Sequence, residues 1–180
     1  MLSNEEIAAQ LPRSLHTRSE TVVVVAIETP LQDEVAALLE KSDAYGDALY
    51  PPDARFGVDI TVLVQPNVRF HVARYDGAAI GCGALVVHGE GHGELKRMFV
   101  DESARGKGAG RALLQAIEST AASEGIELIQ LETGPFNTEA LGLYRRLGFV
   151  QRGPFGSYSD HPLSIFMEKS LNVDLGSCDS

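Results

Sequence analysis

Three glycines at alternate positions, Gly106, Gly108 and Gly110, follow a strand-like run that ends at Val100, and a helical run starts among them, near Gly108. Glycine has no Cβ, so the backbone of such a segment can approach a ligand closely and turn its N–H groups outward. The first turn of the helix adds N–H groups without intrahelical partners and a partial positive charge. The segment therefore predicts an anion site at a strand-to-helix junction, and phosphate is the usual anion there.

Two common phosphate-binding patterns do not fit this loop. A P-loop requires Lys and then Ser or Thr after its last glycine, whereas Arg111 and Ala112 follow Gly110. A dinucleotide fingerprint requires G-x-G-x-x-G, whereas the spacing here is G-x-G-x-G. Five of the 15 Lys and Arg residues lie between Lys96 and Arg111, although the whole chain has a net charge of −10. The local charge supports a phosphate site, and the overall charge argues against nonspecific nucleic-acid binding.

The loop reads Arg105-x-x-Gly108-x-Gly110 and resembles the [Q/R]-x-x-G-x-[G/A] segment that binds the acetyl-CoA pyrophosphate in the GNAT superfamily of N-acetyltransferases. A second block, similar to that family's second signature, reads Asn137-x-x-Ala140-x-x-x-Tyr144-x-x-x-Gly148-Phe149. The resemblance covers roughly residues 68 to 169. It implies acetyl-CoA as cosubstrate and a primary amine of a small molecule or peptide as acceptor. The alternative, a non-catalytic acyl-CoA-binding sensor module, would keep the loop but would not need Tyr144.

Apolar runs predict seven strands. Val22 to Ile27 is almost wholly apolar and β-branched, which indicates a buried strand. Asp76-Gly77 is a strong signal for a two-residue hairpin turn. The other strands are predicted at Arg69 to Tyr75, Ala78 to His88, Glu94 to Val100, Ile126 to Thr133, from Phe149 onward, and at Leu163 to Lys169.

Helices are predicted between these strands. The first begins with a capping box, in which Thr29 is the cap, Pro30 stands in the first turn and Gln32 completes the box. Another follows the glycine loop, and a third covers Asn137 to Leu147. The segment from Asp43 to Ile60 has little periodicity and predicts a short helix and a loop. Its aromatic residues could either line a substrate cleft or pack in the ordinary way.

The predicted order is β-α-(α)-β-β-β-α-β-α-β-β, which indicates an α/β fold with a single mixed, mostly antiparallel central sheet flanked by helices. This order agrees with the GNAT fold. We expect residues 21–170 to form the acetyltransferase domain, 1–20 a flexible arm and 171–180 a tail. The resemblance also implies that the strand before the loop splays from its parallel neighbour, so that the pantetheine arm pairs with exposed strand backbone. The cofactor-contacting positions are predicted to be Met98, Phe99, Val100, Arg105, Gly106, Lys107, Gly108, Ala109, Gly110, Arg111, Asn137 and Tyr144.

Acetyl transfer to an amine requires a base, because at pH 7 only on the order of one lysine-like amine in a thousand is neutral. Alternation along the strand places Glu94, Lys96, Met98 and Val100 on one predicted face. Glu94 is therefore the candidate catalytic base, and the resembled family often has a glutamate on this strand that acts through water. The alternative is a solvated or salt-bridged glutamate at a strand end. Further base candidates, which the sequence does not rank, are His71, His92, Tyr158, Asp160 and His161.

The departing thiolate requires a proton, and Tyr144 is the candidate catalytic acid because a phenol can donate a proton without being charged. The resembled family commonly has a tyrosine acid at this motif position; the alternative is a core aromatic residue. Asn137 stands at the predicted helix start, where the family's residue contacts the pantetheine arm and where the alternative is a simple N-cap. A backbone N–H near Phe99 or Val100 is the candidate donor to the developing oxyanion.

Composition limits the remaining possibilities. No apolar run approaches the roughly 20 residues of a membrane span, and residues 1–20 lack the apolar core of a signal peptide, so a cytoplasmic enzyme without membrane or nucleic-acid partners is expected. Cys82 and Cys178 provide no disulfide framework. His88 and His92 lack a third ligand of matching spacing, so no metal is predicted. The sequence leaves a homodimer open.

Overall fold

The computed structural model describes residues 22–51 and 58–171, so the predicted arm at 1–20 and nearly all of the predicted tail at 171–180 lie outside the described residues. One seven-stranded sheet has the order β1-β2-β3-β4-β5-β7-β6. Among the strands of these residues, only β4 and β5 pair in parallel. The strands are β1 Val24–Ile27, β2 Val68–Tyr75, β3 Ala78–Gly89, β4 His92–Val100, β5 Leu128–Thr133, β6 Val150–Arg152 and β7 Ile165–Ser170. The helices are α2 Asp33–Leu49, α3 Ile60–Leu63, the short 3₁₀ turn η2 Glu102–Ala104, α4 Ala109–Ser123 and α5 Thr138–Arg146.

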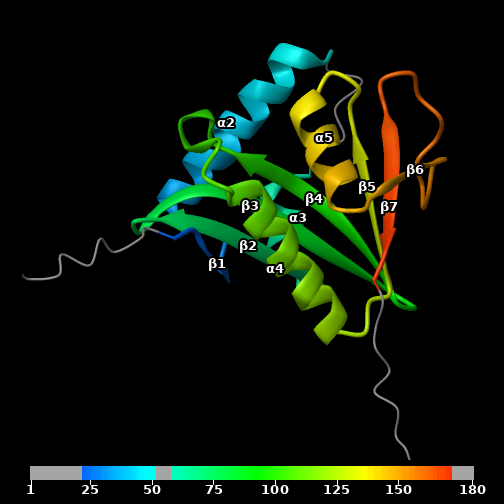
Figure 1. The fold of residues 1–180 in the computed structure, drawn as a ribbon, viewed down its shortest axis with the longest axis horizontal. Helices are drawn as coiled ribbons and strands as arrows, with labels where there is room; N and C mark the ends of the chain where they lie inside the picture. The colour runs from blue at the N-terminus through cyan, green and yellow to red at the C-terminus, as the bar shows by residue number, and fades with distance from the viewer. Residues whose placement is uncertain (1–21, 52–57, 172–180) are drawn as a thin grey trace, which may run out of the picture.

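Helices cover both faces of the sheet, and the predicted fold class is confirmed. Figure 1 shows α4 lying in front of the strands. One apolar cluster joins α2 and α3 to one face through Val35, Leu39, Leu63, Phe70, Val72, Cys82 and Ala84. A second cluster joins α4 and α5 to the opposite face through residues that include Leu85, Leu95, Leu114, Ile117, Leu131, Leu141 and Tyr144.

The two parallel strands separate along their length. Pairing between β4 and β5 runs from His92↔Leu128 to Leu95↔Leu131 and then stops. Strand β4 nevertheless continues to Val100, and Figure 1 shows the two strands diverging from their shared end. The backbone of β4 after Leu95 therefore lacks a strand partner on its β5 side in the described part of the chain, as the predicted splay requires.

A β-bulge interrupts β4 at the point where the strands separate. The register between β3 and β4 shifts here, so that Arg97 and Met98 together oppose Gly83. Arg97 has a φ of 53°, a left-handed conformation that is uncommon outside glycine. A bulge adds a residue to one strand and changes which way the following side chains point.

The bulge overturns the prediction that Glu94, Lys96, Met98 and Val100 share one face. Met98 packs with Leu95 against the cluster beneath α4 and α5, and Val100 packs on the same side. Glu94 alternates with Leu95 and therefore points to the opposite face. Strict alternation failed because the extra residue reverses the order of side chains in the second half of β4.

Strand β1 is less buried than its composition suggests. It pairs only with β2, at one edge of the sheet, and Val24 and Ile27 are 63% and 54% exposed. The prediction of a buried strand was therefore wrong, although a strand does form. A β-branched run favours extended backbone but carries no information on whether the strand lies inside the sheet or at its edge.

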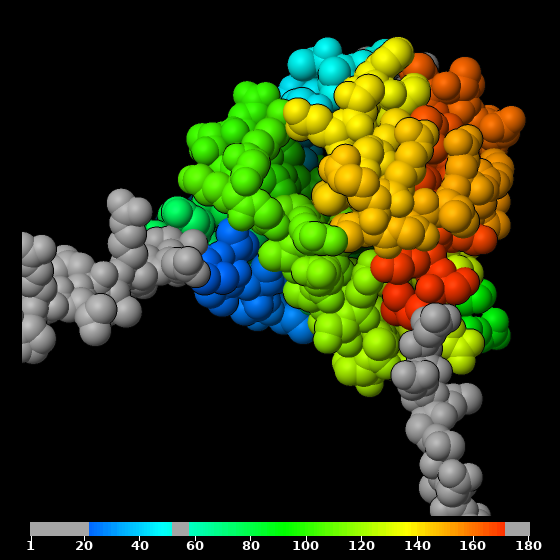
Figure 2. Space-filling model, viewed as in Figure 1, coloured from blue at the N-terminus to red at the C-terminus, as the bar shows by residue number. Residues whose placement is uncertain are grey.

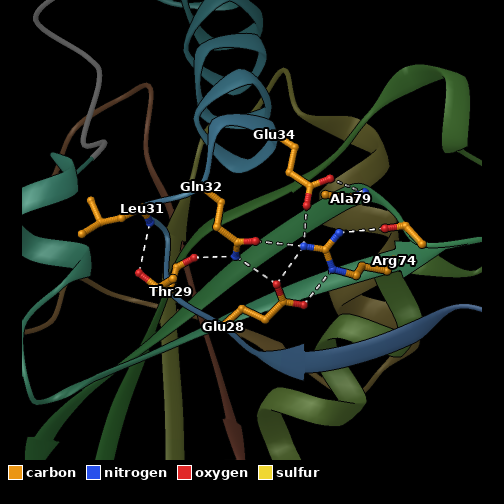
Figure 3. Close-up of polar contacts among 8 residues, drawn as sticks. Glu28, Thr29, Leu31, Gln32, Glu34, Arg74 and Ala79 are labelled. Atoms are coloured by element: carbon orange, nitrogen blue, oxygen red, sulfur yellow. Dashed lines mark hydrogen bonds and ion pairs between the residues drawn. The ribbon is translucent and has the colours of Figure 1, made fainter.

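The start of α2 also differs from the prediction. The helix begins after Gln32, whose side chain makes no capping bond, and the Thr29 hydroxyl accepts from the Leu31 N–H, at 3.2 Å, which lies before the helix. The Gln32 side-chain oxygen instead accepts from the guanidinium of Arg74 on β2, at 3.1 Å. The same guanidinium donates through two of its nitrogens to the Glu28 carboxylate, at 2.9 Å each (Figure 3). The predicted box was wrong because the Gln32 side chain bonds to Arg74, Glu28 and the Thr29 carbonyl instead of the Thr29 N–H.

Candidate active site

A cavity of about 780 Å³ opens between the glycine loop, the end of β4 and helix α5. Figure 2 shows the corresponding hollow between the green segment before α4 and the yellow-orange α5. We call it the donor cavity. Lys107 is absent from its walls, since its ammonium lies 4.5 Å from the centre of the Tyr75 ring. The other predicted cofactor-contacting residues line it: Met98, Phe99, Val100, Arg105, Gly106, Gly108, Ala109, Gly110, Arg111, Asn137 and Tyr144.

Backbone conformation shapes the loop side of the donor cavity. Gly106 and Gly108 have φ values of 78° and 81°, which favour glycine, and Gly108 is the N-cap of α4. Gly108 offers no side-chain cap, so the first N–H groups of α4 remain available to a bound anion. Arg105 reaches across the opening, 3.0 Å from Glu139 of α5 and 5.4 Å from the centre of the Tyr45 ring of α2.

A second cavity of about 570 Å³, which we call the acceptor cavity, adjoins the first. Carboxylates predominate among its charged residues, which are Asp43, Asp47, Asp59, Glu94, Glu132, Lys96 and Arg97. Both of these cations are paired with carboxylates: Lys96 lies 3.0 Å from Glu94, and Arg97 bonds to Asp43. Burial raises the pKa of Glu132. The two cavities share walls at Ser42, Gly46, Tyr50, Met98, Asn137 and Tyr144.

Tyr144 stands where the two cavities meet. Its side chain is only 4% exposed, and its ring centre lies 5.7 Å from that of Phe149. Burial raises the pKa of the Tyr144 phenol, so the hydroxyl keeps its proton at neutral pH. Its helix α5 packs into the core, so the residue belongs to the core and also lines both cavities.

The Glu94 carboxylate is buried at the acceptor cavity and bonded on both oxygens. Oε1 accepts from the Tyr158 hydroxyl at 2.8 Å and lies 3.0 Å from the Lys96 ammonium. Oε2 lies 3.1 Å from Nε2 of His88. The alternative of a solvated glutamate is therefore wrong, whereas the salt-bridged alternative holds together with a position in the cavity wall.

The structure separates the other base candidates. His71 is fully buried, and its ring bonds to Thr120 of α4 and to a backbone carbonyl, away from both cavities. His92 is exposed at the start of β4. Tyr158 bonds to Glu94, and His161 is close enough to influence the pKa of Glu132. Asp160 is exposed and lines neither cavity.

Sequence reasoning did not single out Tyr50, beyond noting that aromatics in its segment could line a cleft. Its hydroxyl accepts from the backbone N–H groups of Phe136 and Asn137, at 2.8 and 3.0 Å, so it joins the end of α2 to the start of α5. A Cβ on Gly134 would lie 2.2 Å from the Tyr50 ring, so only glycine allows this approach. The signal available in the sequence was Gly134-Pro135, which predicted only the end of the strand that precedes it.

Asn137 occupies the N-cap position of α5, but its side chain makes no capping bond. The simple N-cap alternative is therefore wrong. The residue lines both cavities, where its side chain remains available to a ligand.

Known proteins of similar sequence and fold are acetyltransferases and acyltransferases. The Acetyltransferase (GNAT) family matches residues 33–149. The IAA acetyltransferase of Azospirillum brasilense is 47% identical over 150 residues, which cover 83% of this chain and 98% of that protein. A crystal structure from Klebsiella pneumoniae, assigned as an acyl-CoA N-acyltransferase, is 34% identical with a TM-score of 0.71, covering 83% of this chain and 97% of that one. The PaiA N-acetyltransferase of Thermoplasma acidophilum, crystallised with coenzyme A, shares the fold at 18% identity, with a TM-score of 0.64 and 83% and 99% coverage.

The chain belongs to the GNAT family of acetyltransferases. It is an acyltransferase that transfers an acetyl group to an amine, and these relatives give no support to a non-catalytic sensor. Within the described residues no group of three His, Cys, Asp or Glu side chains is placed to hold a metal ion. No helix in the described ranges is long and apolar enough to cross a membrane.

Proposed function

We propose that the chain transfers the acetyl group of acetyl-CoA to a primary amine of a small molecule or peptide. The observation that carries this proposal is the junction of two cavities at Tyr144, one with a glycine-loop anion site and the other with carboxylate walls. CoA in the donor cavity would place its pyrophosphate on the backbone of Arg105 to Gly110 and its pantetheine arm beside Met98 to Val100. Its thioester would then lie near Tyr144.

The residues supply three functions in this proposal. Glu94, directly or through one water, takes a proton from the amine, whose nitrogen then attacks the thioester carbonyl. A backbone N–H at Phe99 or Val100 stabilises the oxyanion of the tetrahedral intermediate. The C–S bond then breaks, and Tyr144 donates its phenolic proton to the departing sulfur.

The acceptor cavity favours a cationic acceptor. The charged side chains that line it in the described part of the chain are five carboxylates and two cations, and each cation is already paired with one of the carboxylates. An ammonium group entering this cavity is attracted, whereas an anionic acceptor is repelled. The proposed acceptor is therefore an amine without a neighbouring carboxylate, such as a diamine or the side-chain amine of a peptide.

The experiment is an acetyl-CoA assay that detects free thiol over a panel of primary amines. The panel pairs each cationic amine with an amino acid of similar size. We expect thiol release that depends on the amine and is faster with the cationic member of each pair. The acetylated product should be confirmed by mass. Thiol release without an acetylated amine would contradict the proposed reaction, and equal rates within the pairs would contradict the acceptor class.

A further inference from the structure

The Glu94 carboxylate connects the acceptor cavity to the protein surface. Its Oε1 bonds to Tyr158 and Lys96, and its Oε2 lies 3.1 Å from Nε2 of His88. The Glu94 side chain is 8% exposed, whereas that of His88 is 51% exposed. His88 lines neither cavity. The two oxygens of one carboxylate thus bond toward a buried set of side chains and toward a half-exposed imidazole.

A buried general base must release one proton in every turnover. Glu94 regains its basicity only after the proton taken from the amine has reached solvent. An exit through the acceptor cavity is obstructed while the acetylated product still occupies it. A half-exposed group that bonds to the second oxygen would provide a separate route.

We propose that His88 is the proton exit of the acceptor cavity. This inference rests on the proposed role of Glu94 as base. The amine proton binds one oxygen of Glu94, and rotation of the carboxyl group about its Cγ–Cδ bond brings that O–H to Nε2 of the His88 tautomer that carries its proton on Nδ1 and a lone pair on Nε2. Nε2 accepts the proton, which restores the carboxylate. The imidazolium then releases its Nδ1 proton to water, which leaves an Nε2–H that donates to Oε2, and exchange with water returns the Nδ1–H tautomer before the next turnover.

The other two groups that bond to Glu94 are poorly suited to this role. The Lys96 ammonium has no lone pair to accept a proton. Tyr158 already donates its hydroxyl to Oε1, and burial together with the Glu94 charge raises its pKa, so the phenol stays protonated. Imidazole, by contrast, has one nitrogen that can accept a proton and a second that can release one.

Two substitutions of His88 separate proton transfer from positioning. In His88→Gln the amide N–H can still donate to Oε2, but the side chain cannot carry a proton. In His88→Ala both functions are lost, and space is left for free imidazole. His92→Gln is the matched control, since His92 is an exposed histidine nearby on the next strand and has no bond to Glu94.

We expect His88→Gln and His88→Ala each to lower kcat about tenfold, with the KM for acetyl-CoA unchanged and His92→Gln as active as wild type. Added imidazole should restore the turnover of His88→Ala in proportion to its concentration. Retained activity in His88→Gln, or a defect in His88→Ala that imidazole leaves unchanged, would overturn the relay, because a positioning role alone explains either result.

Glu94→Gln, measured in parallel, distinguishes this inference from the proposed function. If Glu94→Gln is impaired while both His88 variants are fully active, Glu94 remains the base and the exit through His88 is wrong. If Glu94→Gln is as active as wild type, the assignment of the base is wrong and the relay fails with it. Failure of the wild-type enzyme to acetylate any amine would contradict the proposed function itself.

Discussion

The donor and acceptor cavities adjoin, yet they are built in different ways. The donor cavity takes its walls mainly from two segments, residues 98–111 and 137–147, and the first of them contains the glycine loop. The acceptor cavity takes its walls from smaller groups of residues on α2, the segment before α3, β4, the end of β5 and α5. A site that binds a ligand through backbone N–H groups requires glycine at fixed spacings and therefore leaves a motif in the sequence. A site built from side chains on distant elements leaves none.

The two cavities also differ in charge. Among the described residues, Arg105, Arg111 and Arg146 line the donor cavity together with one carboxylate, Glu139, whereas carboxylates predominate in the acceptor cavity. In the proposed function, an anionic cofactor and a cationic amine are each attracted to the cavity of opposite charge. The net charge of −10 reports neither feature, because it sums over the whole surface.

The largest effect is expected at the junction of the cavities. Tyr144→Phe removes the hydroxyl and keeps the buried ring, so kcat should fall about 100-fold or more, with little change in the KM for acetyl-CoA. Steady-state kinetics would measure both constants. Tyr75→Phe, outside both cavities, is the control. A fall of less than about threefold would mean that the thiolate leaves unaided and that Tyr144 serves packing alone.

A smaller effect is expected in the donor cavity alone. Gly108→Val places a side chain at a φ of 81° beside the proposed pyrophosphate site, and CoA affinity by calorimetry should fall about tenfold. Gly125→Val is the matched control, since Gly125 has a φ of 73°, also has open space around its Cβ, and lies at the other end of α4. Each variant carries a similar backbone strain of about 1–2 kcal/mol. Equal CoA affinity in the two variants would contradict the proposed binding of the pyrophosphate at this loop.

An effect that shrinks as pH rises is expected in the acceptor cavity. Glu94→Gln should lower kcat/KM about tenfold at low pH, where nearly all of the amine is protonated, and the defect should shrink as pH approaches the amine pKa. Glu118→Gln, which disturbs the Glu118–Lys169 ion pair outside both cavities, is the control. CoA affinity should be unchanged. A pH profile parallel to that of wild type would show that another group accepts the proton.

The sequence by itself determined the elements that local chemistry controls. The glycine loop, the Asp76-Gly77 hairpin and the helix that carries Tyr144 all lie where the sequence predicts them. Each depends on neighbouring residues alone, through positive φ, turn geometry or helical periodicity. These local signals were enough to predict the order of strands and helices, which agrees with the GNAT fold. They also predicted most of the residues that line the donor cavity.

Only the tertiary structure decided which side chains meet. Strand composition did not reveal the bulge at Arg97, so the predicted face of β4 was wrong beyond Lys96. The contact of Glu94 with His88 depends on how two antiparallel strands align, and its contact with Tyr158 joins positions 64 residues apart. Tyr50 meets the start of α5 across 86 residues, and Gly134 gives it room. Such contacts depend on strand register and helix packing, which are set by the sum of many burial energies over the whole chain and therefore leave no local pattern.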